Sequence, residues 1–203
     1  MSLIKPLFAI TVLLLASTVS ALTVRSDDSV TINEAHFNVF AREQSQVRIE
    51  ELAKIHHAVV GRDAMMTING GEISKLYGRG SSVISATNSR IREIAVGGSS
   101  ELTLDSVANL QRLFLIGHAK LNIIATDVSY NGKLLTGTWA DGNAFSFQMV
   151  NAKGFLKGEL PRTVAVTAPN NVPLSPAAGF FTAALVSLGL LGRRRNLGAA
   201  FHS

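Results

Sequence analysis

The chain has 203 residues, no cysteine and a formal net charge of +5 at pH 7. This length is enough for one domain with its own core, and the lack of cysteine excludes disulfides, thiolate metal sites and a cysteine nucleophile. From Leu22 to Pro169 there are 15 Lys or Arg residues and 14 Asp or Glu residues, so the excess positive charge lies at the two ends. We therefore expect no nucleic-acid partner, because such a partner requires a basic face on the folded domain.

Residues 1–21 form the first predicted element, a secretory signal peptide. Lys5 precedes a short apolar run, and the small side chains of Val19 and Ala21 suit a signal peptidase. We expect cleavage between Ala21 and Leu22, which would place the mature protein outside the inner membrane. A retained membrane anchor is the alternative, but the apolar run is shorter than the roughly 20 residues that a spanning helix needs.

Residues 22–133 repeat a short pattern in which one polar residue stands between two apolar residues. The starts of successive copies are separated by 17, 19, 18, 18 and 19 residues. Such a triplet predicts a half-buried strand whose outer residues point inward and whose middle residue points to water. The copies are Val30-Thr31-Ile32, Val47-Arg48-Ile49, Met66-Thr67-Ile68, Ile84-Ser85-Ala86, Leu102-Thr103-Leu104 and Leu121-Asn122-Ile123.

Two further columns keep nearly the same period. One is a second column of apolar residues, and the other is a column of glycines. The glycines are expected where the chain turns, because glycine adopts positive φ without strain. The apolar column comprises Phe37/Phe40, Ile55/Ala58, Ile73/Leu76, Ile91/Ile94, Leu110/Leu113 and Val128. The glycine column comprises Gly61, Gly78, Gly97 and Gly117.

A period of 17–19 residues is too short for a repeat of paired helices and suits one coil of a β-solenoid. The predicted fold is therefore all-β, a parallel β-solenoid of about six coils. A β-sandwich is the main alternative, but its strand spacing would not normally keep so constant a register. The side chains expected to stack inside are Ile49, Ile68, Leu104 and Ile123.

Residues 134–160 predict a β-hairpin that closes the solenoid. Two strand-like segments flank Asp141-Gly142, a dipeptide typical of tight hairpin turns. We favour a capping role for this hairpin over a platform for a ligand, because an open sheet edge promotes aggregation. The aromatic residues expected to cover the last coil are Trp139, Phe145 and Phe147.

The last predicted elements are a tether and a membrane-spanning helix. Residues 161–171 are expected to form the extended tether. Residues 176–192 are 17 residues without charge, which as a helix would measure about 25 Å, the short limit for a bilayer span. Arg193, Arg194 and Arg195 follow directly and are expected to stay on the cytoplasmic side with residues 196–203. A buried core helix is the alternative, but a β-rod would not surround such a helix with protein.

Segment 172–195 resembles a known sorting signal. Its motif reads Val172-Pro173-Leu174-Ser175-Pro176-Ala177 and is followed by the apolar helix and the three arginines. This order is similar to the PEP-CTERM sorting signal, in the variant with a Val-Pro-Leu-Pro-Ala core, from which Ser175 departs. The resemblance implies recognition and cleavage near the motif by exosortase, a membrane-embedded cysteine protease-transpeptidase. It also implies an association with exopolysaccharide, at the cell envelope or in a biofilm matrix.

The body shows no specific catalytic or metal-binding pattern, and no cofactor is expected. His56 and His57 are adjacent, so on a strand they would face opposite sides and could not hold one ion together. Glu34 and Glu51 occupy equivalent turns of neighbouring coils and would lie about 5 Å apart, a separation that suits a retaining glycosidase. We favour solvated turn acids for this pair. An ice-binding face is also disfavoured, because Arg48 interrupts the threonines of the outward column.

We therefore expect an exported β-solenoid, sorted by exosortase, that acts as a structural or adhesive protein of the cell surface or extracellular matrix. Its expected partners are exosortase, the membrane before processing, and exopolysaccharide. The alternative function is that of an extracellular carbohydrate-active enzyme, a glycan hydrolase or lyase, which would use Glu34 and Glu51.

Overall fold

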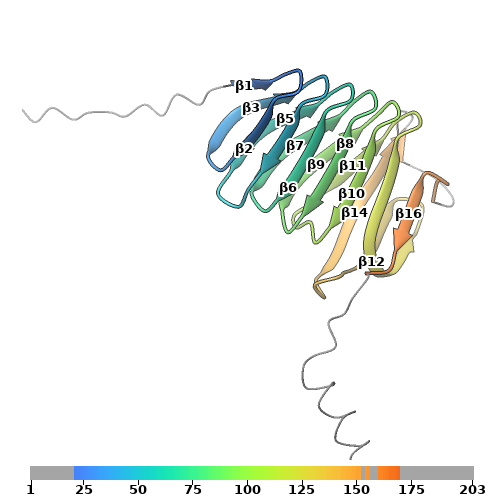
Figure 1. The fold of residues 1–203 in the computed structure, drawn as a ribbon. Helices are drawn as coiled ribbons and strands as arrows, with labels where there is room; N and C mark the ends of the chain where they lie inside the picture. The colour runs from blue at the N-terminus through green and yellow to red at the C-terminus, as the bar shows by residue number, and fades with distance from the viewer. Residues whose placement is uncertain (1–20, 152–153, 156–159, 170–203) are drawn as a thin grey trace, which may run out of the picture.

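A computed structural model describes residues 21–151, 154–155 and 160–169 of the chain. These residues form sixteen β-strands and no helix. Most strands pair in parallel with the strand two positions further along the chain, which winds the body into a β-solenoid of about six turns (Figure 1). The predicted all-β class and the parallel solenoid are confirmed for this part of the chain.

Each turn of the solenoid contributes one strand to each of two sheets, which we call sheet A and sheet B. Both sheets run without interruption from the first turn to the last. Sheet A contains β1 (Ala21–Val24), β3 (Ala35–Ala41), β5 (Lys54–Val60), β7 (Glu72–Gly78), β9 (Arg90–Val96) and β11 (Arg112–Leu115). Sheet B contains β2 (Ser29–Ile32), β4 (Gln46–Ile49), β6 (Met65–Asn69), β8 (Val83–Thr87), β10 (Glu101–Asp105) and β12 (Lys120–Tyr130).

Sheet B is built from the predicted triplets. Each middle residue pairs with the middle residue of the next triplet, in an unbroken ladder from Thr31 to Asn122. The predicted register of these triplets is therefore confirmed, because a shift of one residue would have turned every apolar side chain to water. The four side chains expected inside all have 0% exposure, and they are Ile49, Ile68, Leu104 and Ile123.

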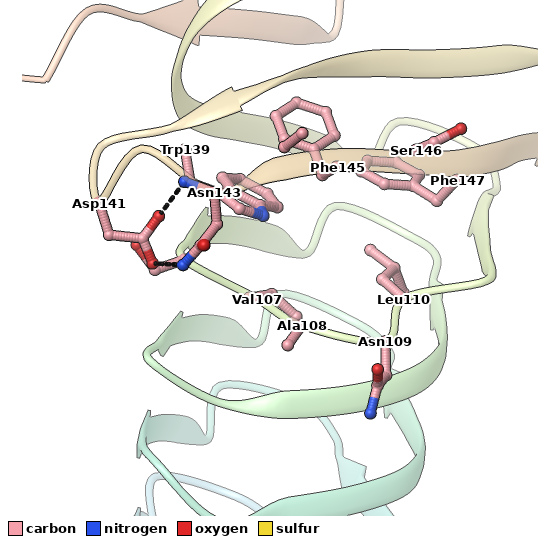
Figure 2. A pocket seen from close by; sticks show the side chains of 12 residues that line it. Val107, Ala108, Asn109, Leu110, Trp139, Asp141, Asn143, Phe145, Ser146 and Phe147 are labelled. Carbon is pink, nitrogen blue, oxygen red and sulfur yellow. Dashed lines mark hydrogen bonds between the residues drawn. The ribbon is translucent and has the colours of Figure 1, made fainter.

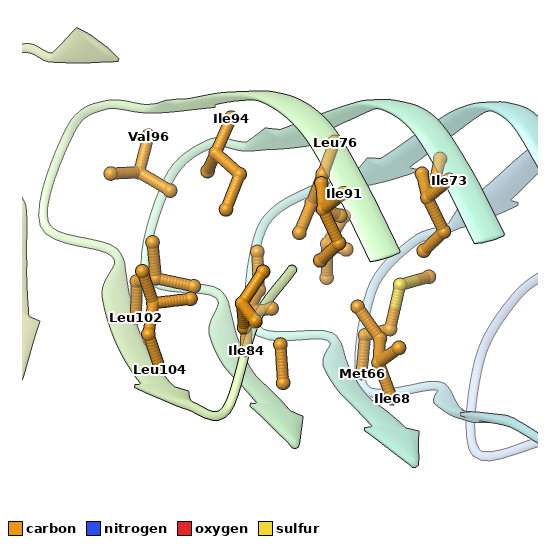
Figure 3. Packing of buried hydrophobic residues seen from close by; sticks show 14 of the residues in the cluster. Met66, Ile68, Ile73, Leu76, Ile84, Ile91, Ile94, Val96, Leu102 and Leu104 are labelled. Carbon is orange, nitrogen blue, oxygen red and sulfur yellow. The ribbon is translucent and has the colours of Figure 1, made fainter. Parts of the chain in front are cut away.

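The core consists of aliphatic side chains stacked in columns between the two sheets (Figure 3). Met66, Ile84 and Leu102 follow one another in one column of sheet B, and Ile73 and Ile91 do so in sheet A. All five are at most 1% exposed. Each such side chain contributes about 1.5–3 kcal/mol of burial free energy, but only when a neighbouring coil covers it. The stability of each coil therefore depends on its neighbours.

Each long strand of sheet A bends near its middle. In β5 the buried residues are Ile55, Ala58 and Val60, so that His56 and His57 both lie on the outer surface. β3, β7 and β9 share this pattern, and the ladder of paired residues skips the position of the bend. The prediction that the two histidines face opposite sides is wrong, because the bend interrupts the alternation of a regular strand. Their ring centroids are 4.4 Å apart.

The second apolar column is displaced by one residue in the first coil. His36, and not Phe37, pairs with Ile55, and His36 is 8% exposed whereas Phe37 is 46% exposed. In the same way Val39 points inward and Phe40 points outward. The prediction of Phe37 and Phe40 as column members is therefore wrong. The residue that pairs with Ile55 is therefore one position earlier in the sequence than the predicted Phe37.

The turns that follow the sheet A strands contain a column of residues with positive φ. Of the predicted glycine column, only Gly117 belongs to it. Gly78 is the buried last residue of β7, and Gly61 and Gly97 begin their turns, one residue before the position of positive φ. The prediction of a glycine turn column is therefore wrong for Gly78, whereas Gly61 and Gly97 lie at the turns but do not have positive φ. The column comprises Ser26, Glu43, Arg62, Gly80, Gly98 and Gly117, with φ between 56° and 72°.

The predicted hairpin closes the end of the solenoid. β12 leaves sheet B and pairs in antiparallel fashion with β13 (Leu134–Trp139), which in turn pairs with β14 (Ala144–Asn151). β14 then lies in parallel beside β11. Met149 therefore continues the buried column after Leu113, and the prediction of Val128 for this place is wrong.

Two short strands complete the described residues. β15 (Gly154–Phe155) pairs with β14, and β16 (Val164–Thr167) pairs in parallel with β12. The Thr167 hydroxyl also donates a hydrogen bond of 2.7 Å to Oδ1 of Asn122. Residues 164–167, within the segment expected to be an extended tether, thus extend the end of sheet B.

The remaining predicted elements fall at or beyond the limits of the described residues. Ala21 and Leu22, between which cleavage is expected, are the first residues of β1 and pair with β3. The motif Val172–Ala177, the helix predicted at 176–192 and the arginines at 193–195 lie outside the described residues. Within residues 21–169, as far as they are described, no helix is long and apolar enough to cross a membrane.

Candidate functional site

A cleft lies where the hairpin meets the turn between β10 and β11 (Figure 2). Its volume is about 430 Å³. The segment 106–110 forms one wall, and hairpin residues between Trp139 and Phe147 form the other. The polar side chains that line it are those of Ser106, Asn109, Asp141, Asn143 and Ser146.

The first wall is a loop that replaces part of a sheet A strand. The side chains of Val107 and Leu110 turn into the core, where they are 2% and 7% exposed. The amide of Ala108 donates a hydrogen bond of 2.8 Å to the carbonyl of Ser89 in the coil below. These anchors hold Asn109, which has a φ of 63°, on the outer surface beside the cleft.

The second wall contains a carboxylate held in a turn. Oδ1 of Asp141 accepts a hydrogen bond of 2.9 Å from the amide of Asn143, and Oδ2 accepts one of the same length from the Asn143 side chain. The backbone hydrogen bond from Asn143 is the main reason why the pKa of Asp141 lies below its ordinary value; the side chains of Asn143 and Ser106 act in the same direction. Asp141 is therefore an ionised hydrogen-bond acceptor at neutral pH.

Three aromatic rings support this wall. The ring centroids of Trp139 and Phe145 are 4.2 Å apart, and those of Phe145 and Phe147 are 5.6 Å apart. Trp139 and Phe147 are nearly fully buried, at 3% and 1% exposure, whereas Phe145 is half-buried. Trp139 and Phe147 thus cover the last coil as predicted, and Phe145 presents part of its ring to the cleft.

This arrangement suits binding better than hydrolysis. An ionised carboxylate, amide groups and hydroxyl groups can hydrogen-bond a hydroxylated ligand, and a half-buried aromatic ring can pack against its apolar face. Glycosidic hydrolysis requires a pair of carboxyl groups, one of them protonated as a general acid. The lining residues include one carboxylate, Asp141, and its lowered pKa is opposite to that of a general acid.

Sequence reasoning found the hairpin and its aromatic residues but assigned them only to capping. The cleft depends on the loop 106–111, which the repeat period does not reveal. The loop does not lengthen this coil, because β11 is shorter than β9 and the loop occupies the positions that the missing part of the strand would fill. Only the polar residues between Asp105 and Arg112 hint at a loop in this place.

Glu34 and Glu51, the candidate catalytic pair, lie in turns of different length. Ile32 pairs with Ile49 before the turn and Ala35 pairs with Lys54 after it, so that the second turn is two residues longer. The equivalence on which the pairing was based is therefore lost. Oε1 of Glu34 lies 3.3 Å from Nε2 of His36. Glu51 packs over Gly70, whose added Cβ would come within 2.8 Å of Glu51 Cγ.

His56 and His57 lie side by side on the outer surface of β5. Burial, and then the neighbouring His56 and Lys75, lower the pKa of His57 from its ordinary value. The ring of His56 stacks on Phe37 with centroids 4.9 Å apart. Among the described residues no three histidine, aspartate or glutamate side chains are placed to hold one metal ion.

The net charge of residues 22–169 is close to zero, but the outer surface of sheet A is basic. Eight cationic side chains occupy outward positions of sheet A or the residues directly after its strands, whereas Glu72 and Glu93 are the acidic side chains found there. Sequence counting missed this face, because it requires knowing which residues point outward at the bend of each strand. The cationic residues are Arg25, Arg42, Lys54, Lys75, Arg79, Arg90, Arg92 and Arg112.

Comparison of the chain with models of protein families, with curated proteins and with solved structures gave no match. The functional argument therefore depends on the residues and geometry of this chain.

Proposed function

We propose that the protein is an exported structural or adhesive protein of the cell surface or extracellular matrix, and that it binds exopolysaccharide. The observation that carries the proposal is the cleft beside the hairpin. There an ionised Asp141, two amide side chains, two hydroxyls and the half-buried ring of Phe145 line one cleft. Sugars offer hydroxyl groups to such acceptors and apolar ring faces to such a ring.

The ends of the chain support export and sorting. The predicted signal peptide directs the chain across the inner membrane, and Val172-Pro173 with the following apolar stretch and arginines resembles an exosortase signal. The proposed sequence of events is export, retention by the C-terminal helix, cleavage near the motif and release of the solenoid to the cell surface. The resemblance also links such proteins to exopolysaccharide.

A hydrolase or lyase that uses Glu34 and Glu51 gains no support from the geometry. The turns that carry the two residues differ in length, and Glu34 faces His36 rather than a second carboxyl group. The cleft beside the hairpin offers a single carboxylate. The binding function therefore fits the described residues better than a catalytic one.

The test is equilibrium binding of the full chain to neutral and acidic polysaccharide fractions from the matrix. We expect Asp141→Asn and Phe145→Ala to weaken binding to the neutral fraction by about tenfold, since each removes one contact of the cleft. Asp63→Asn is the matched control, because Asp63 is an exposed acid remote from the lining residues. Unchanged binding in both cleft variants would overturn the proposal, and so would new reducing ends or unsaturated products.

A further inference from the structure

A second hollow lies at the edge of the basic face of sheet A, over the first coils of the solenoid. Its volume is about 480 Å³. Arg25, Arg42, Arg62 and Arg79 line it, together with Glu43. We call this feature the arginine hollow.

The arginine hollow exists because glycine replaces arginine at one position of a column. Arg25, Arg42, Gly61 and Arg79 directly follow successive strands of sheet A. Successive strands are about 4.8 Å apart, so the backbones of Arg42 and Arg79 lie about 10 Å apart, on either side of Gly61. The missing side chain leaves the space between two guanidinium groups open to solvent.

Neither packing nor backbone conformation requires glycine at position 61. A Cβ on Gly61 would meet no heavy atom closer than the carbonyl oxygen of Ala41, at 4.0 Å. Gly61 is also absent from the residues with positive φ. By contrast, a Cβ on Gly78 would approach Ile84 Cδ1 to 2.9 Å. Gly61 therefore opens the hollow without being needed for the fold.

The acid in the hollow is already engaged. Oε2 of Glu43 accepts hydrogen bonds from the amide and hydroxyl of Ser26, at 3.0 and 3.2 Å, and Oε1 lies 3.8 Å from Nη1 of Arg62. Among the described residues, Arg25, Arg42 and Arg79 form no ion pair. Three exposed arginines thus line one space, and none of them has an ion-pair partner among the described residues.

One of these arginines is held in place by a ring. The guanidinium of Arg42 lies over Phe40, 5.6 Å from the ring centroid. This contact positions the guanidinium beside the hollow before any ligand arrives. Phe40, Val59 and Tyr77 form an apolar column that runs next to the arginine column on the outer face of sheet A.

We propose that the arginine hollow binds the acidic groups of an anionic polysaccharide. Guanidinium forks match planar carboxylate oxygens in two parallel hydrogen bonds, and sulfate oxygens offer similar acceptors. The basic face continues from the hollow toward Arg90 and Arg92, so that a long chain meets further cations along the rod. The inference rests on the proposed function for the glycan partner, and adds the charge class of the glycan and its site.

The geometry favours a glycan over a nucleic acid. Single-stranded nucleic acids gain much of their affinity from bases that stack on accessible aromatic rings, but Arg42 lies over Phe40 and Tyr77 is half-buried. Reading a duplex requires an element that enters a groove, and the outer face of sheet A is formed by paired strands. DNA nevertheless shares the negative charge and therefore belongs in the test.

The test measures binding of the full chain, in mild detergent, to three probes: polygalacturonate, the same polymer with its carboxyl groups reduced, and duplex DNA at the same charge concentration. We expect the carboxylated polymer to bind at least about tenfold more tightly than the reduced polymer, with affinity falling as salt rises. Arg42→Gln with Arg79→Gln should weaken this binding by about tenfold or more.

Gly61→Leu separates the shape of the hollow from its charge, since it fills the space without removing a cation. It should weaken binding of the carboxylated polymer by a similar factor. Gly97→Leu is the matched control, because a Cβ there meets Ile116 Cβ at an ordinary 3.7 Å and lies outside the lining residues. Arg48→Gln on sheet B controls for net charge. Thermal unfolding of every variant identifies loss of fold.

Each result decides the inference. Binding of the carboxylated polymer that falls in the hollow variants and not in the controls supports it. Equal affinity for DNA, equal affinity for the reduced polymer, or hollow variants that bind like the controls would overturn it. If the hollow variants bind normally but the cleft variants lose neutral polysaccharide, the inference fails while the proposed function stands. Failure of every glycan to bind overturns both.

Discussion

Gly98 lies directly against Gly80 in the turn column, and a Cβ on Gly98 would stand 2.9 Å from the carbonyl oxygen of Gly80. The two residues have φ values of 71° and 72°. Successive turns of the solenoid therefore nest with backbone against backbone. The close approach requires a residue without a side chain at position 98, and the left-handed conformation favours glycine there.

Gly98→Ala should destabilise the protein by about 1–3 kcal/mol, because it adds a strained φ to a clash with backbone atoms. Gly97→Ala is the control one residue earlier, where a Cβ makes only ordinary contacts, and it should change stability by no more than about 0.5 kcal/mol. Urea denaturation followed by circular dichroism measures both. Equal effects at the two positions would show that the turns do not nest in this way.

Ile68→Ala should lower the free energy of unfolding by about 2–5 kcal/mol, because it leaves a cavity in a column that has 0% exposure. Thr67 is the neighbouring residue on the same strand, but its side chain is exposed. Thr67→Ala should therefore change stability by only about 0.5 kcal/mol. Thermal or chemical unfolding compares the pair. A larger loss for Thr67→Ala would reverse the assignment of inward and outward faces.

Acidification should destabilise the protein through His57. The pKa of His57 is lowered from its ordinary value of 6.5 in the folded chain, mainly by burial and also by His56 and Lys75. The unfolded chain therefore binds the proton more readily, so that the free energy of unfolding falls as pH drops through 6.5 and levels off below the folded pKa. Unfolding midpoints measured across this range should show the decline.

His57→Gln should flatten that pH profile, because glutamine cannot take up the proton. His118→Gln, at an exposed turn, is the matched control and should leave the profile as it is in the parent chain. A profile that keeps its slope in His57→Gln would assign the pH dependence to another group.

The sorting prediction concerns residues outside the described part of the chain. Changing Val172-Pro173 to Ala-Ala should leave an uncut precursor of higher mass in the membrane, because proline is expected to keep the motif extended and accessible before the predicted helix. Removing Arg193–Arg195 should leave export intact but disturb the processing of the tail. Mass spectrometry of the protein from cells and medium identifies both mature ends. The same mature C-terminus in both variants and in the parent chain would contradict the sorting role.

The parts of the fold that could be predicted from sequence are those fixed by local periodicity. The sheet B ladder from Thr31 to Asn122 follows directly from triplets whose alternation admits one register. The hairpin followed from the Asp141-Gly142 turn. The bend of the sheet A strands could not be predicted, because two consecutive outward residues break the alternation on which strand periodicity depends. In the first coil this allowed the exposed Phe37 to be mistaken for the buried position that His36 occupies.

Both candidate binding features depend on how neighbouring coils, or the last coil and the hairpin, lie against one another, which no local pattern contains. The cleft requires Asn109 and Asp141 to lie on its two walls, at the junction of the last coil and the hairpin. The arginine hollow requires Arg42 and Arg79 to lie on either side of Gly61, whose glycine appeared in the sequence to be a turn residue. The pairing of β16 with β12 joins segments more than forty residues apart, as in the 45-residue separation of Thr167 and Asn122. Tertiary geometry, and not composition, defines these features.

Two residues of the turn column affect both the stability of the fold and the lining of the arginine hollow. Gly80, Gly98 and Gly117 adopt the left-handed conformation without strain, but Glu43 and Arg62 adopt it at a cost of about 1–2 kcal/mol each. Both strained residues line the arginine hollow. Selection for heat resistance alone should therefore drive positions 43 and 62 toward glycine and remove the Glu43–Arg62 ion pair from the hollow. In the N-terminal coils, substitutions that stabilise the solenoid should therefore also change the side chains that line the hollow.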